Sequence, residues 1–214
     1  MGIGPTARRL LGRHEKRVAD WYRACFLDAP ALAEAVAAVG PGPRLLEIGC
    51  GDGVMTEALV GRLPGATVLG IDIAEHPGRL YAGDPARASF RRCTVQELAA
   101  EGGPPFDTVL VVDVLHHVDD VLLTDLLAVA ARLCRPGGHL MVKEWERNGS
   151  PGFWAGWFSD RVVSGQQVRF FDANELAARV IAAVPGAVCT DRRRVPPGRA
   201  NLLVSWRLPA PATD

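Results

Sequence analysis

The sequence predicts an α/β fold with a mainly parallel sheet, and three observations lead to this prediction. Short apolar segments alternate with helical segments from residue 43 onward. Pro and Gly residues separate these segments at short intervals, as they do at the ends of helices and strands. Of the 214 residues, 48% are hydrophobic, so the chain can bury a sizeable core without disulfides. Alternation of strand and helix implies right-handed crossovers between strands that run in the same direction.

The residues before this alternation are expected to be helical. Apolar side chains recur there at helical spacing, and a second short helix is expected to open at Pro30 and to end in the Gly-Pro-Gly-Pro run at 40–43. We therefore expect an N-terminal helical cap over 1–42, followed by one main domain over 43–214. The apolar positions of the first helix are Val18, Trp21, Tyr22, Cys25 and Phe26.

Several segments of the main domain are expected to be strands. The segment 106–112 is strongly apolar, which is typical of a strand that is buried on both faces of the sheet. The last two segments can pair as a hairpin across the Pro-Pro-Gly run at 196–198. In chain order, the expected strands are 44–48, 67–71, 90–94, 106–112, 139–143, 188–195 and 201–208.

Three helices are expected between these strands, at 53–63, 119–135 and 172–184. Pro-Gly runs end the first two of them, and Asp119 or Asp120 can cap the second one at its start. The connection after residue 71 is expected to lack an intact helix, because a Pro-Gly pair interrupts it at residues 77 and 78.

Composition excludes several classes of function. The formal net charge is zero, so no overall electrostatic attraction to nucleic acid or to an anionic membrane is expected. No apolar run is long enough for a membrane span, and the first residues lack the pattern of a signal peptide. The cysteines form no C-x-x-C pair and fit no zinc spacing, so reduced thiols in a cytoplasmic protein are expected. These cysteines are Cys25, Cys50, Cys93, Cys134 and Cys189.

The first strand is followed by a glycine turn that is typical of a nucleotide-binding site. Gly49, Gly51 and Gly53 allow the backbone to turn sharply and to approach a ligand closely. Asp72 ends the second strand, where a carboxylate can accept hydrogen bonds from two ribose hydroxyls or, alternatively, cap a helix. A dinucleotide-binding turn would have a glycine where Val54 stands, so the spacing argues against a nicotinamide enzyme.

The segment 47–53, Glu-Ile-Gly-Cys-Gly-Asp-Gly, resembles the first motif of class I S-adenosylmethionine-dependent methyltransferases. Asp72 and the segments 112–118 and 133–140 match the later motifs of this family in the same order. The resemblance extends over residues 43–145 and is nearest to the group of the ubiquinone and menaquinone methyltransferases. It implies a Rossmann-like, doubly wound sheet of seven strands, mostly parallel, with an antiparallel last strand.

The resemblance also implies the cofactor, S-adenosyl-L-methionine, and its product, S-adenosyl-L-homocysteine. The glycine turn would frame the methionine part, Asp72 would hold the ribose and Ile73 would pack on the adenine. Asp113 and Val114 would lie near the sulfonium, and His116 would line the floor of the site. The cofactor residues expected outside the adenine-binding segment are Glu47, Gly49, Cys50, Gly51, Asp72, Ile73, Asp113, Val114 and His116.

One segment departs from the pattern of the family. After the third strand, the family usually has a Gly-Asp pair whose carboxylate meets the adenine amino group, whereas this chain has Cys93-Thr94-Val95-Gln96. Thr94 or Gln96 can supply a neutral acceptor in its place, and Val95 can supply a backbone N–H.

Methyl transfer needs a base only if the nucleophile must lose a proton. His116 and His117 follow the fourth strand, so either is a candidate base, and Asp160 is a third candidate. The alternative is that the two histidines belong to the scaffold, with one ring on the cofactor and the other bound to the backbone. No carboxylate cluster typical of metal-dependent O-methyltransferases stands out, so no metal is expected.

The segment 144–172 is expected to be a lid on the substrate side, because this family places substrate-binding insertions after the fifth strand. It is rich in aromatic residues and glycines, although such a cluster can also simply pack a long loop on the core. The N-terminal helix can fold over the same opening or can remain a solvated cap. The expected substrate-binding residues are Trp21, Tyr22, Trp145, Trp154, Trp157, Phe158 and Arg169.

Three functions remain open at this point. The first is a methyltransferase of secondary metabolism that acts on oxygen, carbon or nitrogen of a small apolar or aromatic metabolite, as a monomer or homodimer. The second is a methyltransferase that acts on a macromolecule. The base-gripping motif Asn/Asp-Pro-Pro-aromatic is missing after the fourth strand, so no nucleic-acid partner is expected. The third is a non-catalytic subunit, against which the intact glycines argue.

Overall fold

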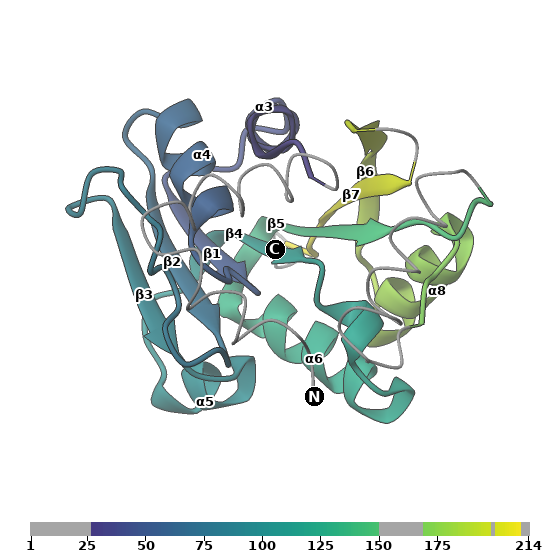
Figure 1. Ribbon diagram of the computed structural model, residues 1–214. Coiled ribbons are helices and arrows are strands. Elements are labelled where there is room, and N and C mark those ends of the chain that lie inside the picture. Colours follow the sequence, from purple (N-terminus) through teal and green to yellow (C-terminus); the bar gives the residue numbers. More distant parts are fainter. Residues whose placement is uncertain (1–26, 150–168, 198–199, 211–214) are drawn as a thin grey trace.

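The computed structural model describes residues 27–149, 169–197 and 200–210 (Figure 1). Its centre is a seven-stranded sheet with the order β3-β2-β1-β4-β5-β7-β6. Strands β1 to β5 run parallel, and β7 runs antiparallel to both β5 and β6. The strands are β1 Arg44–Ile48, β2 Thr67–Asp72, β3 Ala88–Arg92, β4 Phe106–Val112, β5 Cys134–Trp145, β6 Val188–Val195 and β7 Asn201–Arg207. The predicted doubly wound, Rossmann-like fold is confirmed.

Helices cover both faces of this sheet (Figure 1). On one face α3 packs against α4, and on the other α6 packs against both α5 and α8. The helices are α3 Ala29–Ala37, α4 Val54–Arg62, α5 Val95–Glu101, α6 Asp120–Leu133 and α8 Ala173–Ala183, with a short 3-10 turn, η2, at Leu115–His117. None of the helices in the described part of the chain is long and apolar enough to cross a membrane.

Strand β4 lies between two hydrophobic cores. Val109 and Val111 belong to the core under α6 and α8, whereas Leu110 and Val112 belong to the core under α3 and α4. Each of these four side chains is at most 6% exposed, because successive residues of a strand point to opposite faces. The prediction of a strand that is buried on both faces is confirmed. This burial holds β4 in the middle of the sheet, so its carboxyl end lies at the centre of the sheet edge.

Local capping explains where the helices begin. Asp28 accepts a 2.9 Å hydrogen bond from the backbone N–H of Ala31 at the start of α3. Asp172 does the same for two amides at the start of α8. Asp119 stands at the cap position of α6, as predicted, but its side chain makes no capping hydrogen bond.

Several predicted boundaries move for identifiable reasons. Gly53 has a left-handed backbone with φ of 90°, so it precedes α4 rather than opening it. Helix α6 ends at Leu133, because Pro136 disfavours the helical conformation of the residue before it. The Pro-Gly-Gly run therefore lies inside β5. Helix α5 was not predicted, and its cap, Thr94, explains why β3 ends at Arg92. No helix lies between β2 and β3, as predicted.

Candidate active site

A cavity of about 400 Å³ opens at the carboxyl ends of β1, β2 and β4. This is the edge of an α/β sheet where ligands bind, next to the point where the strand order reverses. The predicted cofactor residues that line it are Gly49, Asp72, Ile73, Thr94, Val95, Gln96, Asp113 and Val114. The cavity therefore brings together residues of the glycine turn, the end of β2, the segment 93–96 and the segment after β4.

Other residues of the cavity were not predicted as cofactor residues. Apolar side chains of Ile48, Ile71, Val118 and Leu126 complete its walls, and Cys93 adds a thiol. The alternation of apolar residues along the strands is the signal that can locate such walls. Conversely, the predicted cofactor residues that do not line the cavity are Glu47, Cys50, Gly51 and His116, and His117 lines it instead of His116.

The glycine turn leaves no room for a side chain at residue 49. A Cβ atom at Gly49, which has φ of 84°, would lie 2.3 Å from Cγ2 of Val114 and 2.8 Å from the carbonyl oxygen of Val112. The end of β1 and the end of β4 therefore touch through this glycine. This contact brings the turn that would frame the cofactor against the segment predicted to lie near its sulfonium.

Asp72 is held by two backbone amides. Its Oδ2 accepts a 2.8 Å hydrogen bond from Gly51, and its Oδ1 accepts a 2.8 Å hydrogen bond from Ala74. A carboxylate has about four acceptor positions, so two remain for a diol. Because no helix follows β2, Asp72 fixes two turns rather than capping a helix.

Glu47 is fully buried behind the glycine turn. Its Oε2 accepts a 2.5 Å hydrogen bond from the hydroxyl of Thr56, while Oε1 has no hydrogen-bond partner among the described residues. Burial raises the pKa of Glu47 to about 7, against the hydrogen bond from Thr56. An unpaired buried carboxylate oxygen beside a ligand cavity fits a cationic ligand such as S-adenosylmethionine.

The adenine end of the cavity combines an exposed apolar residue with a helix start. Ile73 is 72% exposed, as expected for a side chain that a flat ligand would cover. Thr94 begins α5 in a capping box, in which its hydroxyl accepts from the amide of Glu97 and its own amide donates to the Glu97 carboxylate. Gln96 donates a 2.9 Å hydrogen bond to Asp125. Both polar side chains therefore also serve the fold.

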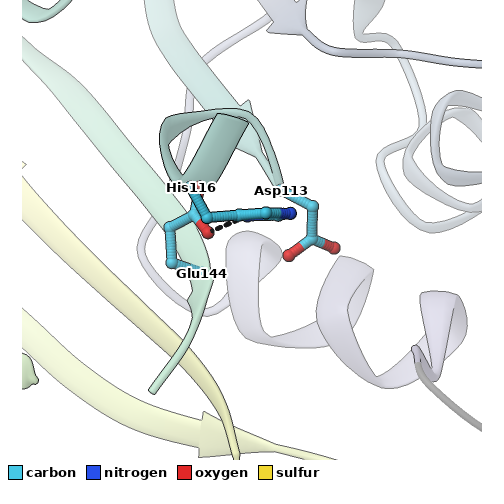
Figure 2. A group of neighbouring side chains, drawn as sticks. All are labelled: Asp113, His116 and Glu144. Atoms are coloured by element: carbon cyan, nitrogen blue, oxygen red, sulfur yellow. Dashed lines mark hydrogen bonds and ion pairs between the residues drawn. The ribbon is translucent and has the colours of Figure 1, made fainter. Parts of the chain in front are cut away.

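A buried histidine–carboxylate pair lies at the ends of β4 and β5 (Figure 2). Nδ1 of His116 lies 2.6 Å from Oε2 of Glu144, and Oε1 of Glu144 accepts a 2.6 Å hydrogen bond from the backbone N–H of Leu115. The two side chains are only 3% and 2% exposed. Burial alone would raise the pKa of Glu144, but its interactions with His116, with Lys143 and with the backbone N–H of Leu115 lower it below its usual value. Glu144 thus fixes the ring orientation, which the sequence interpretation did not anticipate.

His117 differs from its neighbour. It lines the cavity, and its ring centroid lies 3.9 Å from that of His116. Burial, together with the nearby His116, lowers the pKa of His117 to about 4. His117 is therefore neutral near pH 7 and contributes no charge to the site.

A second ion pair, buried at Lys143 and partly exposed at Asp113, joins the same two strands. Nζ of Lys143 lies 2.7 Å from Oδ1 and 2.6 Å from Oδ2 of Asp113, and the Lys143 side chain is fully buried. Asp113 is the only non-glycine residue with positive φ (52°) in the described part of the chain. Burial raises the pKa of Asp113, and the ammonium of Lys143 opposes this rise.

Asp113, His116 and Glu144 each offer one ligand atom, and these atoms lie within 4.8 Å of one another. The ammonium of Lys143, however, already contacts both oxygens of Asp113. Glu144 binds His116 and the amide of Leu115. A cation at this place would compete with an existing cation, so the arrangement fits a hydrogen-bonded charge network better than a divalent metal ion.

The described part of the predicted lid reaches the same place. Phe170 stacks on His116 with centroids 5.6 Å apart, and Trp145 is buried with its ring 5.3 Å from Nζ of Lys143. The backbone N–H of Arg169 donates to the carbonyl of His116, while its guanidinium pairs with Asp120 and with Glu175 at 2.6 Å. The predicted site residues that lie outside the described residues are Trp21, Tyr22, Trp154, Trp157, Phe158 and Asp160.

Comparisons with known proteins agree with this geometry. Residues 14–183 match a family described as a methyltransferase domain. A ubiquinone biosynthesis O-methyltransferase of Hahella chejuensis is 37% identical over 112 residues, which are 50% of this chain and 45% of that protein. The match thus spans less than half the length of this relative.

Two solved structures share the fold. The first is a 1,6-didemethyltoxoflavin-N1-methyltransferase of Burkholderia thailandensis with bound 1,6-didemethyltoxoflavin and S-adenosylhomocysteine; it has a TM-score of 0.68, 25% identity, and coverage of 95% of this chain and 86% of that one. The second is an O-methyltransferase family 2 protein of Planctomyces limnophilus in complex with apigenin; it has a TM-score of 0.67, 21% identity, and coverage of 84% and 56%.

This chain therefore belongs to the methyltransferase domain family. The predicted membership of the class I S-adenosylmethionine-dependent methyltransferases is confirmed, and the Burkholderia thailandensis structure contains S-adenosylhomocysteine, the product of the predicted cofactor.

Proposed function

We propose that this chain transfers a methyl group from S-adenosylmethionine to oxygen, nitrogen or carbon of a small apolar or aromatic metabolite. The observation that carries the proposal is the meeting of two features at one sheet edge. One is the cavity lined by Gly49, Asp72 and Val114, and the other is the buried pair of His116 and Glu144 beside it. A donor site and a candidate proton acceptor are thereby adjacent.

In this proposal, each end of the cavity has its own task. The two remaining acceptor positions of Asp72 take the ribose hydroxyls, Ile73 covers the adenine, and the neutral groups of the segment 94–96 meet the adenine edge. Cys50 and Gly51 contribute through the backbone of the turn, and Glu47 attracts the cationic methionine end from behind it. When bound, the cofactor supplies an electrophilic methyl group on a sulfonium.

His116 is the proposed general base. Glu144 binds Nδ1 and so directs the other ring nitrogen away from β5, toward Asp113 (Figure 2). After a proton moves from the acceptor to His116, the carboxylate of Glu144 stabilises the imidazolium, so Glu144 is a positioning residue. His117 stays neutral and forms part of the wall.

The nature of the acceptor is inferred from the surroundings of this base. Phe170 stacks on this base and Trp145 is buried beside Lys143, which favours an aromatic or otherwise flat acceptor. By their names, one relative belongs to ubiquinone biosynthesis and the other methylates 1,6-didemethyltoxoflavin, and this supports a small-molecule acceptor and leaves the acceptor atom open. We extend the proposal to a lid over 144–172 that includes Trp154, Trp157 and Phe158, and to a cap over 1–42 that includes Trp21 and Tyr22. We further propose a role in cytoplasmic secondary metabolism.

The test has two stages. Calorimetry with S-adenosylmethionine compares the parent chain with Asp72→Ala and with Glu75→Ala, an exposed carboxylate of the same loop outside the cavity. Loss of two charge-assisted hydrogen bonds lowers the affinity of Asp72→Ala by about 10- to 100-fold. Equal affinities would refute the ribose assignment, and thermal unfolding shows whether the turn remains folded.

The second stage measures methyl transfer from labelled cofactor. Catechols, other phenols, flavonoids and fused nitrogen heterocycles are compared with RNA, DNA and a protein extract as acceptors. We expect label in at least one small aromatic class. Label in a macromolecular fraction alone would contradict the proposed substrate class, and cofactor binding without any transfer would point to a non-catalytic subunit.

A further inference from the structure

Lys143 and Asp113 have no part in the mechanism outlined above, although both lie next to its proposed base. Lys143 reaches from β5 past the end of β4 and places its ammonium on both oxygens of Asp113, at 2.7 and 2.6 Å. The backbone agrees with this pairing, because the N–H of Asp113 donates a 3.0 Å hydrogen bond to the carbonyl oxygen of Lys143. Residue 113 is thus fixed to β5 through both its backbone and its side chain.

The ion pair of Lys143 and Asp113 can influence His116, because Asp113 lies close to the His116 ring. Asp113 and Glu144 lie on opposite sides of the His116 ring, and the nitrogen that does not face Glu144 points toward Asp113 (Figure 2). One ligand atom of each of the three residues lies within 4.8 Å of the others. The titratable groups near His116 include Asp113, Lys143, Glu144 and His117, and Arg169 contacts it through its backbone N–H.

We propose that Lys143 keeps His116 able to accept a proton by neutralising the carboxylate of Asp113. This inference rests on the proposed role of His116 as the base. Two unneutralised carboxylates around one imidazole would stabilise its protonated form and so remove the base near pH 7. With Lys143 in place, only Glu144 remains as an uncompensated anion beside the ring. The imidazolium of His116 then balances the negative charge of Glu144. The group of Asp113, Lys143, His116 and Glu144 therefore becomes neutral overall when His116 takes the proton of the acceptor.

Burial makes the effect strong and permanent. The Lys143 side chain is 0% exposed and that of Asp113 is 27% exposed, so solvent reaches the carboxylate but not the ammonium. Opposite charges within 4 to 6 Å shift a pKa by about 1–3 units when they are shielded from solvent. Lys143 is therefore a positioning residue that sets the pH range of the reaction rather than touching the acceptor.

The experiment compares the pH dependence of kcat in three variants. In Lys143→Met, the carboxylate of Asp113 is released, and the acidic limb of the profile moves to higher pH by about 1–2 units, with activity regained at alkaline pH. In Asp113→Asn, the ammonium is left without its anion, and the limb moves to lower pH. The double variant Lys143→Met with Asp113→Asn returns the limb close to its parental position. The control is Arg91→Met, which removes the exposed ion pair between Arg91 of β3 and Glu101 of α5 and leaves the limb unmoved.

Imidazole NMR titration of His116 provides the second readout. We expect the pKa of His116 to rise in Lys143→Met and to fall in Asp113→Asn. An unchanged pKa of His116 in either folded variant would overturn the role of Lys143, and so would a loss of kcat that is uniform across pH. A shifted pKa with an unmoved kinetic limb would instead overturn His116 as the base. If Lys143→Met does not fold, Asp113→Asn and the double variant decide the question alone.

Discussion

Different kinds of chemical group form the two sides of the site. The proposed cofactor side, around β1 and β2, relies on glycines and backbone amides, such as the two N–H groups that hold Asp72. The proposed acceptor side, at the ends of β4 and β5, relies on charged side chains, most of them buried, in which His116 pairs with Glu144 and Asp113 with Lys143. Backbone N–H groups carry no charge that changes with pH, whereas charged side chains do. Binding of the cofactor and the chemical step should therefore respond differently to mutation and to pH.

The largest effect is expected from His116→Ala. If the chemical step depends on the acceptor side, kcat falls by about 10²- to 10⁴-fold, which is the usual contribution of a general base. The affinity for S-adenosylmethionine changes little, because His117 rather than His116 lines the cavity. Single-turnover rates and calorimetry measure the two quantities, with the exposed His76→Ala as control. A large loss of cofactor affinity would show that the two sides are not separate.

Gly49→Ala should damage both sides at once. The added methyl would overlap Val114 and the carbonyl of Val112, and residue 49 would keep a positive φ. The free energy of unfolding is expected to fall by about 2–4 kcal/mol through overpacking and backbone strain. Denaturant titration measures this change. Gly61→Ala is the matched control, because a Cβ atom there meets nothing within 4 Å.

Glu144→Gln should affect the acceptor side alone. The neutral amide no longer stabilises the imidazolium, so the pKa of His116 falls and the acidic limb of kcat moves to lower pH by about one unit. At the plateau, kcat falls by about tenfold or more because the ring is a weaker base. A pH profile at saturating cofactor measures both effects. An unmoved limb would remove Glu144 from the mechanism.

The smallest effect concerns the pH dependence of cofactor binding. Burial raises the pKa of Glu47 to about 7, so this carboxyl is protonated below that pH and ionised above it. A cationic cofactor binds the ionised form better, and its affinity should rise a few-fold as pH increases through 7. Calorimetry from pH 6 to 8 measures this change. Glu47→Gln should flatten the curve, and a slope that persists in this variant would assign it to another group.

The difference between the two sides of the site also determines how much of each side could be predicted from the sequence. The glycine turn, Asp72 and the segment after β4 are local signals, because the residues that must cooperate are close in the chain or end neighbouring strands. Most of the residues predicted to bind the cofactor therefore line the cavity. His116 was also singled out from the sequence, since it directly follows a recognisable strand.

Glu144 and Lys143 were not predicted as site residues, because each finds its partner about 30 residues away along the chain. Two charged residues in succession at the end of an otherwise apolar strand are the signal that could have revealed them, since charges are rarely buried without partners. Helix α5 was missed for a different reason. It has only seven residues, although the Thr94 and Glu97 pair of a capping box stands in the sequence.

The left-handed backbone at Asp113 has a further consequence for redesign. Only glycine, asparagine and aspartate adopt this conformation readily, so few residues fit position 113 without strain. Asparagine nevertheless removes the charge and keeps the shape. The substitution Asp113→Asn thus alters the charge of the site without straining the main chain. Position 113 is therefore a suitable starting point for redesigning the enzyme toward acceptors of different charge.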